Sequence, residues 1–355
     1  MGLLEKIKPG SRAFKITLFI VVGTLVVVGG ALITLWDYYD PEKAFSDHEI
    51  AMEKADDQND AEQAGDRPAN GVKEAEEEQE GSLVVNFLLL GFDYTEQKER
   101  FGREELSAIN TDTIMFVSVD FRENQVKALS IPRDCKVPIA NLDFEDKINH
   151  AYRHGMHYGD GDDSESRHQE GIRYALDTIE NVVSAPIDYH VCIDIDNLIE
   201  IVDLMGGIYY DVERDIRADR GRGRVLIEEG YQHLDGEHFF YYVQYRGYAR
   251  GDMARIDRQQ QILKSALDQF RETGRLSKVP RVFNTLRESI ETNLNSRHIG
   301  SLLRFLQDLK MEDITFYSFE VDGVFEEHGF YKYIDEAHRK ELLYEMLGVE
   351  AEPLK

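Results

Sequence analysis

Two aspartates stand beside apolar segments that are typical of buried β-strands. Asp93 follows the run LLLGF, and Asp112 directly precedes the run TIMFV. In open α/β sheets, ligands lie in the crevice at the strand ends. Mg²⁺ takes one or two protein carboxylates there, keeps several waters and bridges phosphate oxygens. The pair therefore indicates a site for magnesium and phosphate, although an aspartate beside a strand is more often a turn residue.

Segment 241–260, YYVQYRGYARGDMARIDRQQ, is rich in arginine. On a helix, Arg255 and Gln259 are four residues apart and share one face, and Asp252 stands where a helix cap is expected. The arginines of the segment are Arg246, Arg250, Arg255 and Arg258. Pairing with acids of the same helix would account for one of them. For the whole block, recognition of phosphate by forked guanidiniums is at least as good an explanation.

Two more basic residues follow predicted strands. Arg133 comes after a proline in the sequence SIPRD, and Lys147 opens the sequence KINHAY. An acidic protein that holds an anionic substrate needs such a local excess of positive charge. We therefore group Arg133 and Lys147 with the arginine-rich segment as candidate phosphate ligands.

The elements that must position these residues are strands and helices in mixed order. Strands are expected at 83–91, 113–119, 126–131, 189–193, 208–212 and 314–319, with a hairpin turn at 122–124 and a closing strand and loop within 311–335. Helical periodicity appears at 169–183, 195–205, 235–245, 253–273, 297–310 and 335–347. This mixture predicts an α/β fold with a central mixed, largely buried sheet flanked by helices on both faces.

Composition excludes several classes of protein. The 355 residues include 68 acidic and 41 basic ones, for a net charge of −27, and 42% are hydrophobic. Such a chain buries a real core and is not disordered throughout, and it lacks the basic balance of a protein that coats nucleic acid. Cys135 and Cys192 are too few for a disulfide scaffold, and the sequence leaves their pairing open. Neither a Walker loop nor a zincin motif is present.

The first residues of the chain are typical of a membrane anchor. Residues 16–35, ITLFIVVGTLVVVGGALITL, carry no charge and would span about 30 Å as a helix, the thickness of a bilayer core. Basic residues precede this run and aromatic residues follow it, which favours a cytoplasmic N-terminus. We expect a cytoplasmic tail at 1–15 and a single transmembrane helix at 16–36. A cleaved signal peptide is disfavoured because the run is long and ends in Leu35-Trp36-Asp37.

Residues 37–82 contain 16 acidic and 4 basic residues. Phe45 is the only aromatic residue between 40 and 81, and so polar a segment cannot bury enough apolar surface to order itself. We expect a flexible acidic linker at 37–82, followed by an extracellular catalytic domain at 83–355.

A series of motifs in this domain resembles the LytR-CpsA-Psr family of membrane-anchored envelope phosphotransferases. In order, they are NFLLLGFD, TDTIMFVSVD, LSIPRD, KINHAY, APIDYHV, IVDLMGGIYYDV, GYQHLDGEHFFYYVQYR and GDMARIDRQQ, over about residues 83–275. The resemblance implies transfer of a glycan-phosphoryl group from a polyprenyl diphosphate carrier onto peptidoglycan, as in the attachment of teichoic acid or capsule.

The resemblance also implies a role for each matching residue. Asp93 and Asp112 would bind Mg²⁺, for which Mn²⁺ can substitute. The diphosphate ligands would be Arg133, Lys147, Arg246, Arg255 and Gln259. The catalytic set would be Asp112, Arg133, Arg246, Asp252 and Arg255, with the general base either Asp112 or Asp252. The implied partners are the lipid-linked glycopolymer, the peptidoglycan acceptor and the membrane at 16–36, without nucleic acid.

Three positions depart from the family pattern. Gln244 stands where the first arginine of the VRxR motif is expected, Asn110 where an arginine is common, and Cys135 where a hydroxyl residue follows SIPRD. Two other functions therefore remain open. The chain could be a non-catalytic membrane-anchored scaffold that binds polyprenyl-linked precursors, or it could hydrolyse polyprenyl diphosphate.

Three further features are less specific. His150, His154 and His157 have helical spacing, with His168 nearby, but we find no cysteine or acid at ligand spacing, so a solvated helix face is favoured over a metal site. The segment RDIRADRGRGR, 214–224, is equally well an exposed loop or a clamp on an acidic glycan. An apolar groove for the lipid is expected between helices 169–183 and 235–245, although such faces are more often core.

Overall fold

The computed structural model describes residues 40–41, 44–45, 83–92, 109–218, 223–245, 261–262, 265–266, 268–287, 289–327 and 329–354. The predicted transmembrane helix at 16–36, most of the predicted linker and segment 246–260 lie outside these residues. No helix within the described ranges is both long enough and apolar enough to cross a membrane.

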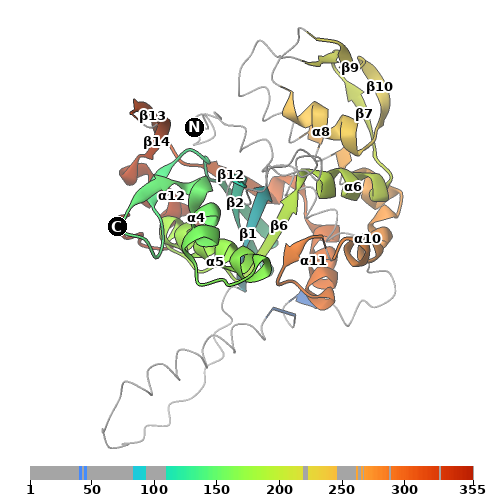
Figure 1. Ribbon diagram of the computed structural model, residues 1–355. Coiled ribbons are helices and arrows are strands. Elements are labelled where there is room, and N and C mark those ends of the chain that lie inside the picture. The colour runs from blue at the N-terminus through green and yellow to red at the C-terminus, as the bar shows by residue number, and fades with distance from the viewer. Residues whose placement is uncertain are drawn as a thin grey trace, which may run out of the picture.

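A six-stranded sheet forms the centre of the domain (Figure 1). In spatial order its strands are β11 (Glu291–Thr292), β6 (Tyr189–Asp194), β1 (Val84–Phe92), β2 (Thr111–Asp120), β3 (Gln125–Ser130) and β12 (Ile314–Ser318). The pairs β1–β6 and β3–β12 are parallel, and the other neighbours are antiparallel. The mixed sheet and the hairpin between β2 and β3 are both as the sequence predicted.

The apolar run of β1 is buried on both of its faces. Leu88 and Leu90 are fully buried on one side of the sheet, and Phe87 and Leu89 are buried on the other. Side chains alternate between the two faces of a strand, so a nearly continuous apolar run fits a strand that is covered on both sides.

Helices cover both faces of the sheet, on opposite sides of it in Figure 1. The core around Leu88 includes side chains of α4 (Ala151–Tyr158), α5 (Ser164–Val183) and α12 (Glu336–Leu347). The core around Leu89 includes those of α6 (Ile195–Met205), α8 (Gly236–Gln244), α10 (Val279–Leu286) and α11 (Ser296–Asp308). Helices on both faces were predicted. The lipid groove expected between 169–183 and 235–245 was wrong, because α5 and α8 belong to cores on opposite sides of the sheet.

The remaining elements are short. They are the strand pairs β4 (Lys136–Pro138) with β5 (Glu145–Lys147), β7 (Ile208–Val212) with β10 (Gly230–Leu234), β8 (Ile216–Arg217) with β9 (Val225–Ile227) and β13 (Val321–Glu326) with β14 (Gly329–Ile334), and the 3₁₀ helices η3 (Ile148–His150), η4 (Arg275–Lys278) and η5 (Met311–Asp313). The loop expected after the closing strand is therefore the β13–β14 hairpin. Gly329 at the start of β14 has a φ of 137°, a conformation that glycine adopts without a steric penalty.

Two residues of the predicted acidic linker are buried in the domain. Ala44 and Phe45 are each 2% exposed. The Phe45 ring stacks on Phe121 and on His298, with centroids 4.9 and 5.1 Å apart. Burial of a phenylalanine contributes about 1.5–3 kcal/mol, which explains why Phe45 packs against the sheet although the segment around it is polar.

Candidate active site

One edge of the sheet gathers the strand ends from which the candidate residues extend. Phe92, the last residue of β1, pairs with Thr111, the first of β2. Ser130, the last residue of β3, pairs with Met115. The residue after Phe92 in the sequence is Asp93, which lies outside the described residues. The end of β1, the start of β2 and the end of β3 thus meet at one edge.

At this edge Arg133 forms an ion pair with Asp112. Arg133 Nη1 donates a hydrogen bond to Asp112 Oδ2. Asp112 is buried, whereas 23% of the Arg133 side chain is exposed. A buried carboxylate needs a partner of opposite charge, and the guanidinium supplies it while still reaching solvent. The structure therefore brings together two of the predicted site residues.

The Arg133 guanidinium retains a donor without an acceptor. Its Nε is buried and has no hydrogen-bond partner among the described residues. The distance from Arg133 Nε to Asp134 Oδ2 is 3.9 Å, which is too long for a hydrogen bond. Buried donors are rarely left unpaired, and a phosphate oxygen is an acceptor that guanidinium groups bind well.

Lys147 joins the pair through Asp134. Lys147 Nζ donates to Asp134 Oδ1 at 3.2 Å, and it lies 5.4 Å from the centre of the Tyr331 ring. The backbones of the two segments are also bonded, since Asn149 N–H donates to Arg133 O at 3.3 Å. The Asp134 carboxylate thus stands between the two cations, Arg133 and Lys147.

The β13–β14 hairpin contacts the segment that carries Asp134. Lys332 N–H donates to Asp134 O at 2.9 Å, and Lys136 Nζ pairs with Glu326 at 3.0 Å. Asp134 and Tyr331 were not among the predicted site residues. Asp134 was visible within SIPRD, but Tyr331 lies far along the chain, and no local pattern links it to Lys147.

Neither cysteine forms a disulfide. Cys135 and Cys192 are buried free thiols. Burial raises the pKa of Cys135 to about 12, so this residue stays protonated beside Asp134. Since the thiolate is the nucleophilic form, burial disfavours Cys135 as a nucleophile.

A pocket of about 350 Å³ opens at the ends of β1 and β6. Its lining includes Phe92, Tyr152, His168, Cys192, Asp194 and Glu291. Tyr152 Oη and His168 Nδ1 lie 2.6 Å apart. Burial raises the pKa of Asp194, whose carboxylate caps α6 by accepting from Asn197 N–H at 2.7 Å. A mixed polar and apolar pocket at strand ends is a usual place for a ligand in an α/β fold.

Several predicted residues lie outside the described part of the chain. They are Asp93, Arg246, Asp252, Arg255 and Gln259. In the basic segment 214–224, Arg217 pairs with Asp215 at 2.6 Å, which favours a local structural role for that arginine.

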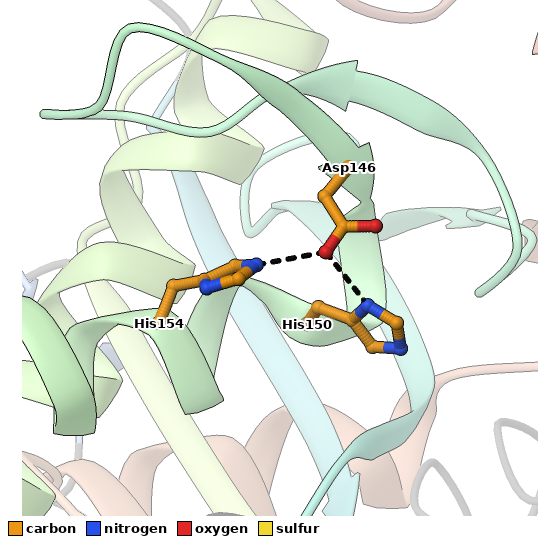
Figure 2. A group of neighbouring side chains, drawn as sticks. All are labelled: Asp146, His150 and His154. Atoms are coloured by element: carbon orange, nitrogen blue, oxygen red, sulfur yellow. Dashed lines mark hydrogen bonds and ion pairs between the residues drawn. The ribbon is translucent and has the colours of Figure 1, made fainter. Parts of the chain in front are cut away.

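The expectation that no acid accompanies the histidines was wrong. Figure 2 shows Asp146 between the His150 and His154 rings, with one carboxylate oxygen bonded to both. Asp146 was not predicted as a partner of the histidines because it lies on the strand before their helix. His157 is not part of this group, and its ring packs edge-on against Tyr158.

The chain matches a family model. The LytR_cpsA_psr family matches residues 46–347, a range that contains every candidate residue named above.

Two curated relatives have names that describe a reaction. The polyisoprenyl-teichoic acid–peptidoglycan teichoic acid transferase TagU of Halalkalibacterium halodurans is 31% identical over 201 residues, 54% of this chain and 58% of that protein. TagT of Bacillus subtilis, with the same descriptive name, is 27% identical over 267 residues, 73% of this chain and 76% of that protein. The chain thus spans little more than half of the TagU relative.

The fold also resembles solved structures. The crystal structure of Bacillus subtilis TagV matches with a TM-score of 0.55 and 25% identity, over 75% of this chain and 97% of that one. The structure of TagT bound to LIIa-WTA matches at 24% identity with a TM-score of 0.54, over 80% of this chain and 98% of that one. The latter likeness concerns the fold alone.

Proposed function

The chain belongs to the LytR-CpsA-Psr family, and we propose that it transfers a glycan-phosphoryl group from a polyprenyl diphosphate carrier onto peptidoglycan in a Mg²⁺-dependent reaction. The observation that carries the proposal is the Arg133–Asp112 pair, with Arg133 Nε unpaired and Lys147 close by. The names of the TagU and TagT relatives support teichoic acid as the glycopolymer.

Phosphoryl transfer asks a protein mainly to position the reactants and to stabilise charge. Arg133 and Lys147 would donate hydrogen bonds to the diphosphate oxygens, and Asp134 would keep the two cations at a fixed separation. Arg246, Arg255 and Gln259 would add donors from segment 246–260.

The reaction balances without a further reactant. A hydroxyl oxygen of the peptidoglycan sugar bonds to the phosphorus next to the glycan, and the bond from that phosphorus to the bridging oxygen breaks. Polyprenyl monophosphate leaves. The hydroxyl proton passes to an aspartate, for which Asp112 and Asp252 are the candidates.

The residues present fit Mg²⁺. The Asp112 carboxylate accepts from Arg133 through Oδ2, and a carboxylate has about four lone-pair sites, so one such group can serve hydrogen-bond donors and a cation together. The buried amide oxygen of Asn149 has no hydrogen-bond partner among the described residues, and oxygen ligands of this kind suit Mg²⁺. In the sequence, Asp93 directly follows Phe92 and Asp112 directly follows Thr111, and Phe92 pairs with Thr111 across the two strands. Bound there, Mg²⁺ or its substitute Mn²⁺ would screen the charge of the diphosphate.

The location of the reaction is part of the proposal. Residues 16–36 would anchor the chain in the cell membrane with the N-terminus in the cytoplasm, and the catalytic domain would face the cell wall. This places the domain next to both the lipid-linked glycopolymer and the peptidoglycan acceptor.

The test is release of polyprenyl monophosphate by the full chain from a polyprenyl diphosphate-linked glycan, with a peptidoglycan acceptor, with and without Mg²⁺. We expect Mg²⁺-dependent release with glycan appearing on the acceptor, and loss of both in R133A. H157A is the matched control, because His157 lies outside the site. Binding of the substrate without release would favour a scaffold, and release without glycan transfer would favour a hydrolase.

A further inference from the structure

Three side chains of suitable chemistry for a metal ion converge beside the candidate active site. Asp146 lies on β5, His150 ends η3 and His154 lies on α4. His150 Nδ1 is 2.9 Å and His154 Nε2 is 2.8 Å from Asp146 Oδ2 (Figure 2). The three potential ligand atoms all lie within 4.8 Å of one another.

The local fold explains why they meet. His150 and His154 are four residues apart on consecutive helical segments, and such residues share a face. Asp146 and Lys147 are neighbours on β5, and neighbouring side chains of a strand point to opposite sides. Lys147 therefore reaches Asp134 while Asp146 faces the two imidazoles. The cluster and the phosphate site use opposite sides of one strand.

The spacing of the atoms suits a transition metal. Ligand atoms on an ion at about 2.0–2.1 Å lie roughly 2.8–3.4 Å from one another, and the two distances of 2.8 and 2.9 Å fall at the lower end of that range. Two imidazoles with one carboxylate form a common set for zinc and for related divalent ions. Mg²⁺ prefers oxygen ligands, so this group differs in kind from the one proposed at Asp112.

The carboxylate is already oriented and charged. Asp146 Oδ1 accepts from Lys147 N–H at 2.8 Å, which leaves Oδ2 turned toward the histidines. Burial raises the pKa of Asp146, but hydrogen bonds from His150 and His154 outweigh this effect and hold the pKa well below its usual range. The three side chains remain accessible, with 14–20% of each exposed.

We propose that Asp146, His150 and His154 bind one divalent transition-metal ion, with Zn²⁺ as the preferred ion and the remaining coordination positions open to water. The proposal does not depend on the transferase function. Bound metal would replace the hydrogen bonds of the cluster by coordination and would fasten β5 to α4. It would thereby fix Lys147 and Asn149, which stand between Asp146 and His150 in the sequence, beside Arg133.

The test is Zn²⁺ binding by the full metal-free chain in competition with a chromogenic chelator. We expect one equivalent bound by the wild type, and affinity lower by about 100-fold or more in D146N, H150Q and H154Q, since even an outer-shell partner is worth about 10–100-fold. H157Q is the matched control on the same helix and should bind Zn²⁺ as the wild type does.

A second measurement keeps the test decisive if a variant changes the fold. Co²⁺ added to the wild-type chain should give visible absorption bands typical of nitrogen ligation. Circular dichroism of the metal-free variants shows whether they keep the native helix content. The proposal is overturned if the wild type binds no equivalent of Zn²⁺, or if well-folded D146N and H154Q bind it as tightly as H157Q does.

Discussion

The two sides of β5 carry the same pairing of an acid with nitrogen groups and yet have different chemistry. On the Lys147 side, Asp134 stands between Lys147 and Arg133. On the Asp146 side, one carboxylate stands between two imidazoles. Lysine and arginine offer only donors and suit phosphate. Neutral imidazole offers a lone pair and suits a metal. Both sides present an aspartate, so the ligand that we propose for each side depends on its nitrogen groups rather than on the acid.

The largest expected effect tests the Lys147 side. R133A should lower the rate of polyprenyl monophosphate release by about 10²–10³-fold, or about 2.7–4 kcal/mol, because an oriented donor to a developing anion is lost. R133K should recover only part of the rate, since an ammonium cannot form two parallel hydrogen bonds. The measurement is the initial rate at saturating substrate. An unchanged rate in R133A would remove the phosphate site from this edge.

The next effect tests the Asp146 side through stability. Zn²⁺ at about 100 times its dissociation constant should stabilise the wild type by about 2.7 kcal/mol, which raises the melting temperature by about 5 °C in a domain of this size. D146N should show no such increase, and H157Q should show all of it. Thermal unfolding with and without Zn²⁺ measures both. An equal increase in D146N would mean that zinc binds elsewhere.

A smaller effect concerns the acid that spaces the two cations. D134N should lower kcat/KM by about 10-fold, or about 1.4 kcal/mol, mainly through KM, because the cations lose their spacing while both remain present. D143N is the matched control, since it makes the same change at an exposed carboxylate. A fall in kcat with KM unchanged would assign Asp134 a direct part in the chemical step instead of a positioning one.

Much of the fold followed from local sequence patterns. The nearly continuous apolar run of β1 and the 3.6-residue periodicity of α6 and α11 can each be recognised within the segment itself, because each reflects how that segment is buried. Phe45 was predicted to lie in a flexible linker because the segment around it is polar on average. Such an average does not show that one residue within the segment is buried. The β13–β14 hairpin was expected to be a loop because most of β13 is exposed and most of β14 is only half-buried, which leaves little hydrophobic alternation to detect.

The two sides of β5 differed in how well the sequence revealed them. Arg133, Lys147 and Asp112 were predicted as site residues because short motifs carry them, and the structure brings all three to one edge. Tyr331 beside Lys147 was missed because only tertiary packing brings β14 to that place. Asp146 was missed for another reason. It stands four residues before His150, but helical periodicity does not extend into a strand.

The smallest effect is a pH dependence that separates Asp146 from the permanent cations across the strand. The folded-state pKa of Asp146 is lowered from its ordinary value of 3.8. Its stabilising contribution is therefore fully present above pH 3.8 and is lost as the pH falls toward the folded-state pKa. D146N cannot titrate, so its unfolding free energy should fall less steeply below that pH, by about 1 kcal/mol for a partly exposed group. Urea unfolding at a series of acidic pH values, with chelator to exclude metal, measures the difference. Parallel curves would mean that the imidazoles do not favour the charged carboxylate, and the contrast between the two sides of β5 would then rest on the metal alone.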